Sequence, residues 1–91
     1  MIYRAEAPDQ ILRESLGAID ALYHRRSGET HLVAAPVPQI LEALGEGPAT
    51  SAGLMARLAA RFDFDGEEDM AALLEQRLAE LVGLGLVHRD G

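Results

Sequence analysis

The residues of this chain that could do chemistry are two histidines seven positions apart, a serine beside a glycine, and one acid-rich run. His24 and His31 would face each other across a β-hairpin if Ser27-Gly28 formed a two-residue turn. Two imidazoles supply only half of a zinc site, and the chain has no cysteine to complete one. Ser27 has no base as a neighbour in the sequence. We therefore predict no catalytic residue and no metal ligand in this region.

The acid-rich run Asp63-Phe64-Asp65-Gly66-Glu67-Glu68-Asp69 is similar at first sight to a calcium-binding loop. It lacks the third acidic ligand before the glycine and the glutamate at the twelfth loop position. A helix start fits better, because Asp65 can cap the first turn and the following carboxylates meet the positive end of the helix dipole. The chain also has no glycine-rich phosphate loop. We predict no metal, no cofactor and no enzymatic activity.

The element that must position these residues is a hairpin over residues 22–33. Counting outward from a two-residue turn gives the pairs Arg26–Glu29, Arg25–Thr30, His24–His31, Tyr23–Leu32 and Leu22–Val33. Strand alternation then predicts one face from Leu22, His24, His31 and Val33 and another from Ala21, Tyr23 and Leu32. A different loop length would shift the pairs. We predict strands over 11–16, 19–24 and 30–34, with the last at the edge of the sheet.

Three helices are predicted after the hairpin. The first carries an apolar stripe at helical spacing, made of Val37, Ile40, Leu41 and Leu44. The second, capped by Thr50 or Ser51, carries Leu54, Met55, Leu58 and Phe62. The third is the longest and is apolar along one broad side from Met70 to Val82. The order predicts a single α+β domain over 1–91, winged-helix-like, with a three-stranded antiparallel sheet followed by three helices. Residues 1–10 are predicted to be a lead-in and residues 88–91 a frayed tail.

Composition and charge narrow the functional classes. The 91 residues have a net charge of −7 and 48% hydrophobic residues, which is typical of a globular chain. The acid excess opposes nucleic-acid binding, because neutralising phosphates needs clustered positive charge. No run approaches a membrane span, and the start lacks the pattern of a signal peptide. The absence of cysteine favours a cytoplasmic protein.

Two features of the predicted fold concern binding. The free backbone groups of Thr30 to Ala34 at the sheet edge could pair with an extended peptide. Apolar surface is also in excess on the third helix and at Tyr23 and Leu32. The alternative is that the edge is simply solvated and that the apolar excess is core.

An ordered set of residues across positions 11–87 resembles the PqqD family, and most closely its branch of peptide chaperones of the HPr-related (HPr-rel-A) system. The set is Leu22-Tyr23-His24-x-x-Ser27-Gly28-Glu29-Thr30-His31-Leu32-Val33, Ile40-Leu41-x-x-Leu44, Gly47-Pro48, Leu54-x-x-x-Leu58 and Leu78-x-x-Leu81-x-x-x-Gly85-Leu86-Val87. Pro36 and Pro38 depart from it, since many relatives have small polar residues or alanine there. Tyr3 stands where an N-terminal tryptophan is common.

The resemblance implies a peptide-binding module without chemistry of its own. Such domains bind the leader of a ribosomally made precursor peptide and present the rest to a modifying enzyme. The leader adds as a strand beside the third strand, in a groove walled by the third helix. Carried onto this chain, the peptide-binding backbone is Thr30, His31, Leu32, Val33 and Ala34, and the groove wall is Leu74, Arg77, Leu78 and Leu81. Arg77 would pair with an acidic leader residue.

Two alternatives belong to other functional classes. A winged helix that binds DNA would need a cationic recognition helix, whereas residues 65–82 hold one arginine and six acidic residues. A scaffold or oligomerisation domain would dock a neighbouring enzyme through Tyr23 and Leu32, and a homodimer is open on this hypothesis.

Overall fold

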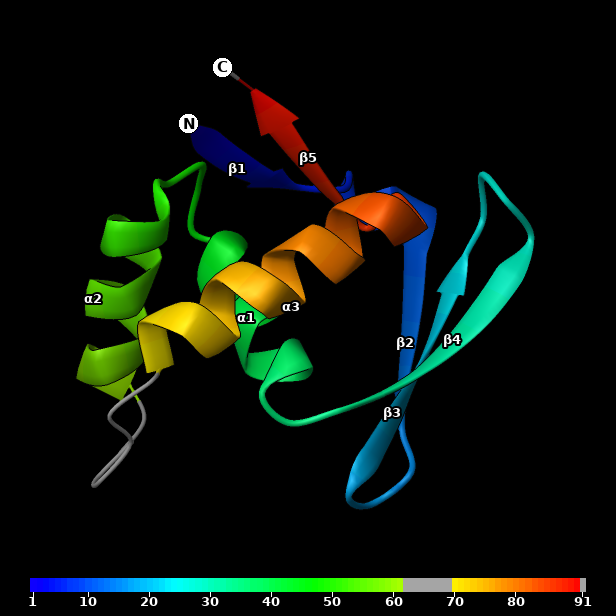
Figure 1. Ribbon diagram of the computed structural model, residues 1–91. Helices are drawn as coiled ribbons and strands as arrows, with labels where there is room; N and C mark the ends of the chain where they lie inside the picture. Colours follow the sequence, from blue (N-terminus) through cyan, green and yellow to red (C-terminus); the bar gives the residue numbers. More distant parts are fainter. Residues whose placement is uncertain (62–69, 91) are drawn as a thin grey trace.

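Two antiparallel sheets and three helices make up the fold in the computed structural model, which describes residues 1–61 and 70–90 (Figure 1). The elements are β1 (Ile2–Ala5), the short 3-10 helix η1 (Pro8–Gln10), β2 (Ile11–Ser15), β3 (Ile19–His24), β4 (Glu29–Ala34), α1 (Val37–Leu44), α2 (Ser51–Arg61), α3 (Met70–Leu84) and β5 (Val87–Asp90). The predicted α+β class with a three-stranded antiparallel sheet and three helices is confirmed. The predicted strand-then-helix order is incomplete, because one strand precedes this set and another follows it.

The two ends of the chain pair with each other. β1 and β5 run antiparallel, with Ile2 opposite Asp90 and Ala5 opposite Val87. The two termini therefore lie side by side (Figure 1). The sequence predicts a lead-in over 1–10 and a frayed tail over 88–91, whereas most of both segments is ordered strand or 3-10 helix. Strands of four residues are too short for alternation to identify, and each is stabilised by a partner at the opposite end of the chain.

The three-stranded sheet has the order β2-β3-β4, and its second hairpin corrects the predicted register. His24 lies opposite Glu29 and Leu22 opposite His31, so the loop contains four residues and closes with a 2.8 Å hydrogen bond from Gly28 N–H to His24 O. A two-residue hairpin turn needs positive φ at its first residue, which Ser27 does not adopt. The correction moves the pairing by two positions, so every side chain keeps its predicted face.

The predicted stripe of α1 and the predicted cap of α2 are confirmed. α1 contains all four residues of its predicted stripe, and Thr50 caps α2 by accepting a 3.1 Å hydrogen bond from Gly53 N–H. Arg57 of α2 holds the end of α1, since its Nη1 donates to the carbonyl oxygens of Ala43 at 3.1 Å and Gly47 at 2.6 Å. The predicted cap Asp65, the calcium-like run 63–69 and Phe62 lie outside the described residues.

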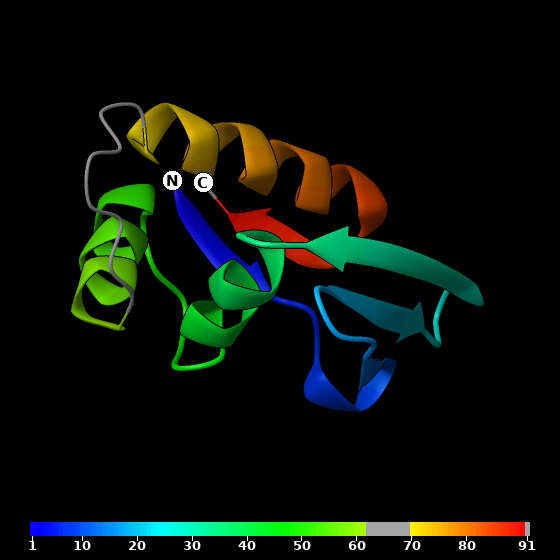
Figure 2. The same cartoon turned by 90° about the horizontal axis from the view of Figure 1, so that it is seen from below.

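An aliphatic core lies where the three helices meet β3 and the start of β5. Its fully buried side chains are Leu22, Ile40, Leu54, Leu58, Leu74, Leu78, Leu81, Leu86 and Val87. Seen from below, β4 lies between α3 and β3, so one edge of the sheet follows α3 (Figure 2). A search of the described helices found none with the length and apolar character that crossing a bilayer requires.

Candidate functional site

A groove of about 350 Å³ separates the second half of β4 from the last turns of α3. Its lining residues come from β4, the start of α1 with the link before it, and α3: Leu32, Val33, Ala34, Ala35, Val37, Arg77, Glu80, Leu81 and Leu84. We call this the β4–α3 groove. Most of its lining is aliphatic, so it suits apolar side chains, and Arg77 and Glu80 place charge on its helical wall.

The outer edge of β4 borders the β4–α3 groove. Among the described residues β4 pairs only with β3. Alternate residues of an edge strand direct their backbone N–H and C=O groups away from the sheet, where another strand can bond to them. From Thr30 to Ala34 the edge carries no Asp, Glu, Lys or Arg that would discourage such pairing.

The five predicted residues of β4 divide into two groups. Leu32, Val33 and Ala34 line the groove, and Leu32 is 68% exposed. Thr30 and His31 lie nearer the hairpin turn and outside the groove lining. The His31 ring is half-buried, and its Nε2 has no hydrogen-bond partner among the described residues.

The four predicted residues of α3 also fall into two groups. Arg77 and Leu81 line the groove, although Leu81 is also a core residue and only 2% exposed, whereas Leu74 and Leu78 are buried in the core away from the groove. Leu74 and Leu78 are four positions apart and share the inward face of the helix. Glu80 and Leu84, which sequence reasoning missed, follow Arg77 by three and seven positions. That helical spacing was the signal that could have identified them as neighbours of Arg77.

The charge in the groove is an ion pair within α3. Arg77 Nη1 donates to Glu80 Oε2, and both side chains are partly exposed. A pair in this setting contributes little to stability, because water screens it. An acidic group entering the groove would therefore have to compete with Glu80 for the Arg77 guanidinium.

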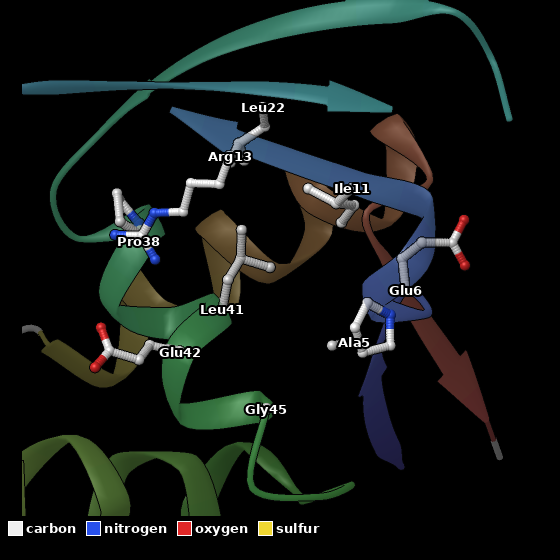
Figure 3. A pocket seen from close by; sticks show the side chains of 10 residues that line it. Ala5, Glu6, Ile11, Arg13, Leu22, Pro38, Leu41, Glu42 and Gly45 are labelled. Atoms are coloured by element: carbon white, nitrogen blue, oxygen red, sulfur yellow. The ribbon is translucent and has the colours of Figure 1, made fainter. Parts of the chain in front are cut away.

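A second cavity, of about 220 Å³, lies at the opposite edge of the sheet between β2 and α1. In Figure 3 the side chains of Ile11 and Leu41 point toward one another across it, and Arg13 extends toward Pro38. Arg13 Nε is bound to Asp20 Oδ2 at 2.6 Å. Glu6 belongs to the lining, but its carboxylate is turned away from the cavity (Figure 3).

That carboxylate is the centre of a buried polar network. Glu6 Oε2 lies 2.7 Å from His24 Nε2 and accepts a 3.2 Å hydrogen bond from Arg26 Nε. Glu6 Oε1 lies 2.9 Å from His88 Nε2 and accepts a 3.1 Å hydrogen bond from the backbone N–H of Ala7. The network therefore ties the segment after β1 to the end of β3, the hairpin loop and β5.

The network keeps Glu6 ionised despite its burial. Hydrogen bonds from His88 and His24 lower the pKa of Glu6 to about 2, and those from Ala7 and Arg26 act in the same direction, while burial opposes them. The side chain is 3% exposed, so its charge is satisfied by these partners and not by water. Sequence reasoning treated His88 as part of a tail and gave Glu6 no role, because the residues meet only in the folded chain.

The hairpin histidines and Ser27 differ from their predicted arrangement. His24 and His31 are not opposite each other, since their partners are Glu29 and Leu22. Ser27 does have a neighbouring base, because its Oγ lies 3.2 Å from His24 Nδ1. The same Oγ accepts a 3.3 Å hydrogen bond from Glu29 N–H, as turn serines often do. Within residues 1–61 and 70–90, no group of three or more His, Asp or Glu side chains could hold a metal ion.

Comparison of the chain with protein-family models, with curated proteins and with solved structures gave no match.

Proposed function

We propose that this chain is a non-enzymatic peptide-binding module. It takes up the leader of a ribosomally made precursor peptide as an added strand at β4 and presents the rest of the peptide to a modifying enzyme. The observation that carries the proposal is the unpaired edge of β4 beside the β4–α3 groove. The resemblance of the ordered motifs to the PqqD family supports it. A winged-helix-like classification and a cytoplasmic location belong to the same proposal.

Strand addition explains how such a site combines affinity with selectivity. Backbone hydrogen bonds to β4 depend little on the peptide sequence, whereas alternate peptide side chains point toward the protein and are selected there. The side chains that enter the groove meet Val33, Leu81 and Leu84, so they are expected to be apolar. An acidic residue placed next to them would reach Arg77 and displace Glu80 from it.

A titration of isotope-labelled protein tests the proposal. The ligand is a synthetic leader of each precursor peptide encoded beside this gene, and the readout is the amide chemical shifts. We expect shifts concentrated in residues 30–35 and 77–84, with smaller changes at the cavity residues Ile11 and Leu41. If none of these leaders shifts the β4 and α3 amides, the proposed function is wrong.

A matched peptide separates strand addition from simple hydrophobic contact. N-methylation of alternate leader residues removes backbone donors but retains every side chain. Methylation on the set that faces β4 should weaken binding at least about tenfold, since several backbone hydrogen bonds are lost together. Methylation on the other set should have little effect. Equal losses from both sets would argue against pairing with β4.

A further inference from the structure

The polar and apolar faces of the three-stranded sheet are the reverse of those expected for a sheet with helices on one side. An antiparallel sheet of this kind usually directs apolar side chains toward the helices and polar ones toward water. Here each face is made of three rows, and each row holds one residue from each of the three strand segments, lying side by side across the sheet. On the face away from the helices, seven of the nine residues are apolar, and the polar two are Glu14 and Thr30. Arg13, Asp20 and His24 belong to the opposite face.

On the inner face Arg13, Asp20 and His24 are paired within the chain, whereas the buried His31 Nε2 has no hydrogen-bond partner among the described residues. Asp20 is bound to Arg13, and His24 is bound to Glu6. The outer face has no such compensation. Its large side chains are exposed by 39% at Tyr23, 43% at Ile19, 51% at Leu12, 57% at Leu16 and 68% at Leu32. We call these residues and their small neighbours the outer sheet face.

We infer that the outer sheet face is a dimer interface that packs against the same face of a second copy of this chain. Contiguous apolar patches of this kind mark interaction sites on proteins. The near absence of charge favours an identical partner, because a face with Glu14 as its one acidic or basic residue carries no pattern that would select a charged one. Two sheets packed face to face with aligned strands are a common way to bury such surfaces.

The arrangement of side-chain sizes supports a twofold pairing. Leu12 of β2 and Leu16, which directly follows β2, contribute long side chains, and β4 contributes the short side chains Thr30 and Ala34 in the same rows. A twofold axis parallel to β3 would lay β2 of one copy over β4 of the other, so that long side chains meet short ones. Tyr23 and Ile19 of β3 would then meet their own counterparts, and Glu14 of one copy would lie over the exposed Leu32 of the other at the edge of the interface.

The interface would be small, and the charge of the chain adds a salt dependence. A three-stranded face lies at the low end of stable interface sizes, so the dimer should be weak. Each copy carries a net charge of −7, and the two charges repel when the copies meet. Salt screens that repulsion, so dimerisation should become stronger as the ionic strength rises.

Sedimentation equilibrium of the full chain tests the inference. Loading concentrations from about 5 μM to about 500 μM cover the range expected for a weak interface. The wild type should shift from monomer to dimer across that range. Ile19→Glu places two carboxylates against each other near the axis and should weaken association at least about tenfold. Ile19→Thr keeps a β-branched side chain and should give a smaller loss.

The matched control is Ile2→Glu, since Ile2 has a similar exposure of 44% but lies on the other sheet. It should associate like the wild type, and circular dichroism should show that all variants are folded. A wild-type chain that remains monomeric throughout, or an equal loss in the Ile2 and Ile19 variants, would overturn the inference. Leu32 is left unchanged because it also lines the β4–α3 groove. A chain that does not dimerise could therefore still bind the leader peptide, and a chain that does not bind the leader could still dimerise.

Discussion

The two edges of the three-stranded sheet differ in how they meet the rest of the chain. At β2, Ala5, Glu6 and Pro8 help to line the cavity between the strand and α1, and the strand carries Arg13 and Glu14. At β4, the groove opens beside five consecutive residues without an acidic or basic side chain of the Asp, Glu, Lys or Arg type.

This difference favours the pairing of an added strand with the β4 edge over the β2 edge. Charged side chains and covering segments are common ways to prevent an edge from pairing with another chain. β2 carries Arg13 and Glu14, and the buried network around Glu6 holds the segment that lines the cavity beside this strand. Along Thr30 to Ala34 β4 carries no Asp, Glu, Lys or Arg, and the β4–α3 groove separates it from α3, so a strand that adds to this sheet should add there.

The largest effect should come from the same substitution made at one lining residue of each cavity, Leu22 of the central strand β3 and Leu32 of the edge strand β4. Leu22→Ala, beside the β2 cavity, removes a side chain that is 1% exposed and should lower the free energy of unfolding by about 2–5 kcal/mol. Leu32→Ala, beside the β4–α3 groove, removes one that is 68% exposed and should change it by no more than about 0.5 kcal/mol. Urea unfolding measures both values. Similar losses in the two variants would show that the two cavities do not differ in burial as described.

A smaller loss of stability is expected when the segment that contains Glu6 loses its hydrogen bonds. Glu6→Gln replaces acceptors of several hydrogen bonds and should lower the free energy of unfolding by about 1.5–3 kcal/mol at neutral pH. Glu14→Gln is the control, since that exposed residue lies on the same edge, and it should have little effect.

The stabilisation by Glu6 should also depend on pH in a defined direction. Its pKa is held at about 2, below the ordinary value of 4.5, so the contribution is complete above about pH 4.5 and is lost as the pH falls toward 2. The difference in unfolding free energy between the wild type and Glu6→Gln should therefore shrink over that window. A difference that stayed constant from pH 7 to the acid limit would contradict the assigned ionisation.

The smallest effects are expected at the charged pair of the β4–α3 groove. Arg77→Ala and Glu80→Gln should each change the free energy of unfolding by no more than about 1 kcal/mol, because the pair is partly exposed. Their effects on an acidic leader peptide should have opposite signs. Arg77→Ala should weaken binding about fivefold, and Glu80→Gln should strengthen it by freeing the guanidinium. Calorimetry measures both binding affinities. Effects of the same sign would show that Arg77 does not recognise an acidic residue of the leader.

The sequence by itself determined the features that depend on local periodicity. Helical spacing predicted α1 and the apolar stripes of α2 and α3, and alternation predicted which face each side chain of β3 and β4 occupies. The faces survived a wrong loop length because strand alternation has a period of two, and the register moved by two positions. Local pattern could not distinguish Leu74 and Leu78, which are core, from Arg77, which lines the groove, because it does not show which surface covers a helix.

Only the tertiary structure decided what depends on residues far apart in the chain. The pairing of β1 with β5 and the contacts of Glu6 with His24 and His88 join the two ends and the central hairpin. Each partner is unremarkable in its own segment, and its hydrogen bonds exist only once the hydrophobic core has brought the segments together. The same holds for the β4–α3 groove, whose two walls are separated by more than forty residues of sequence. Local sequence sets which conformations a segment favours, while packing sets which segments meet.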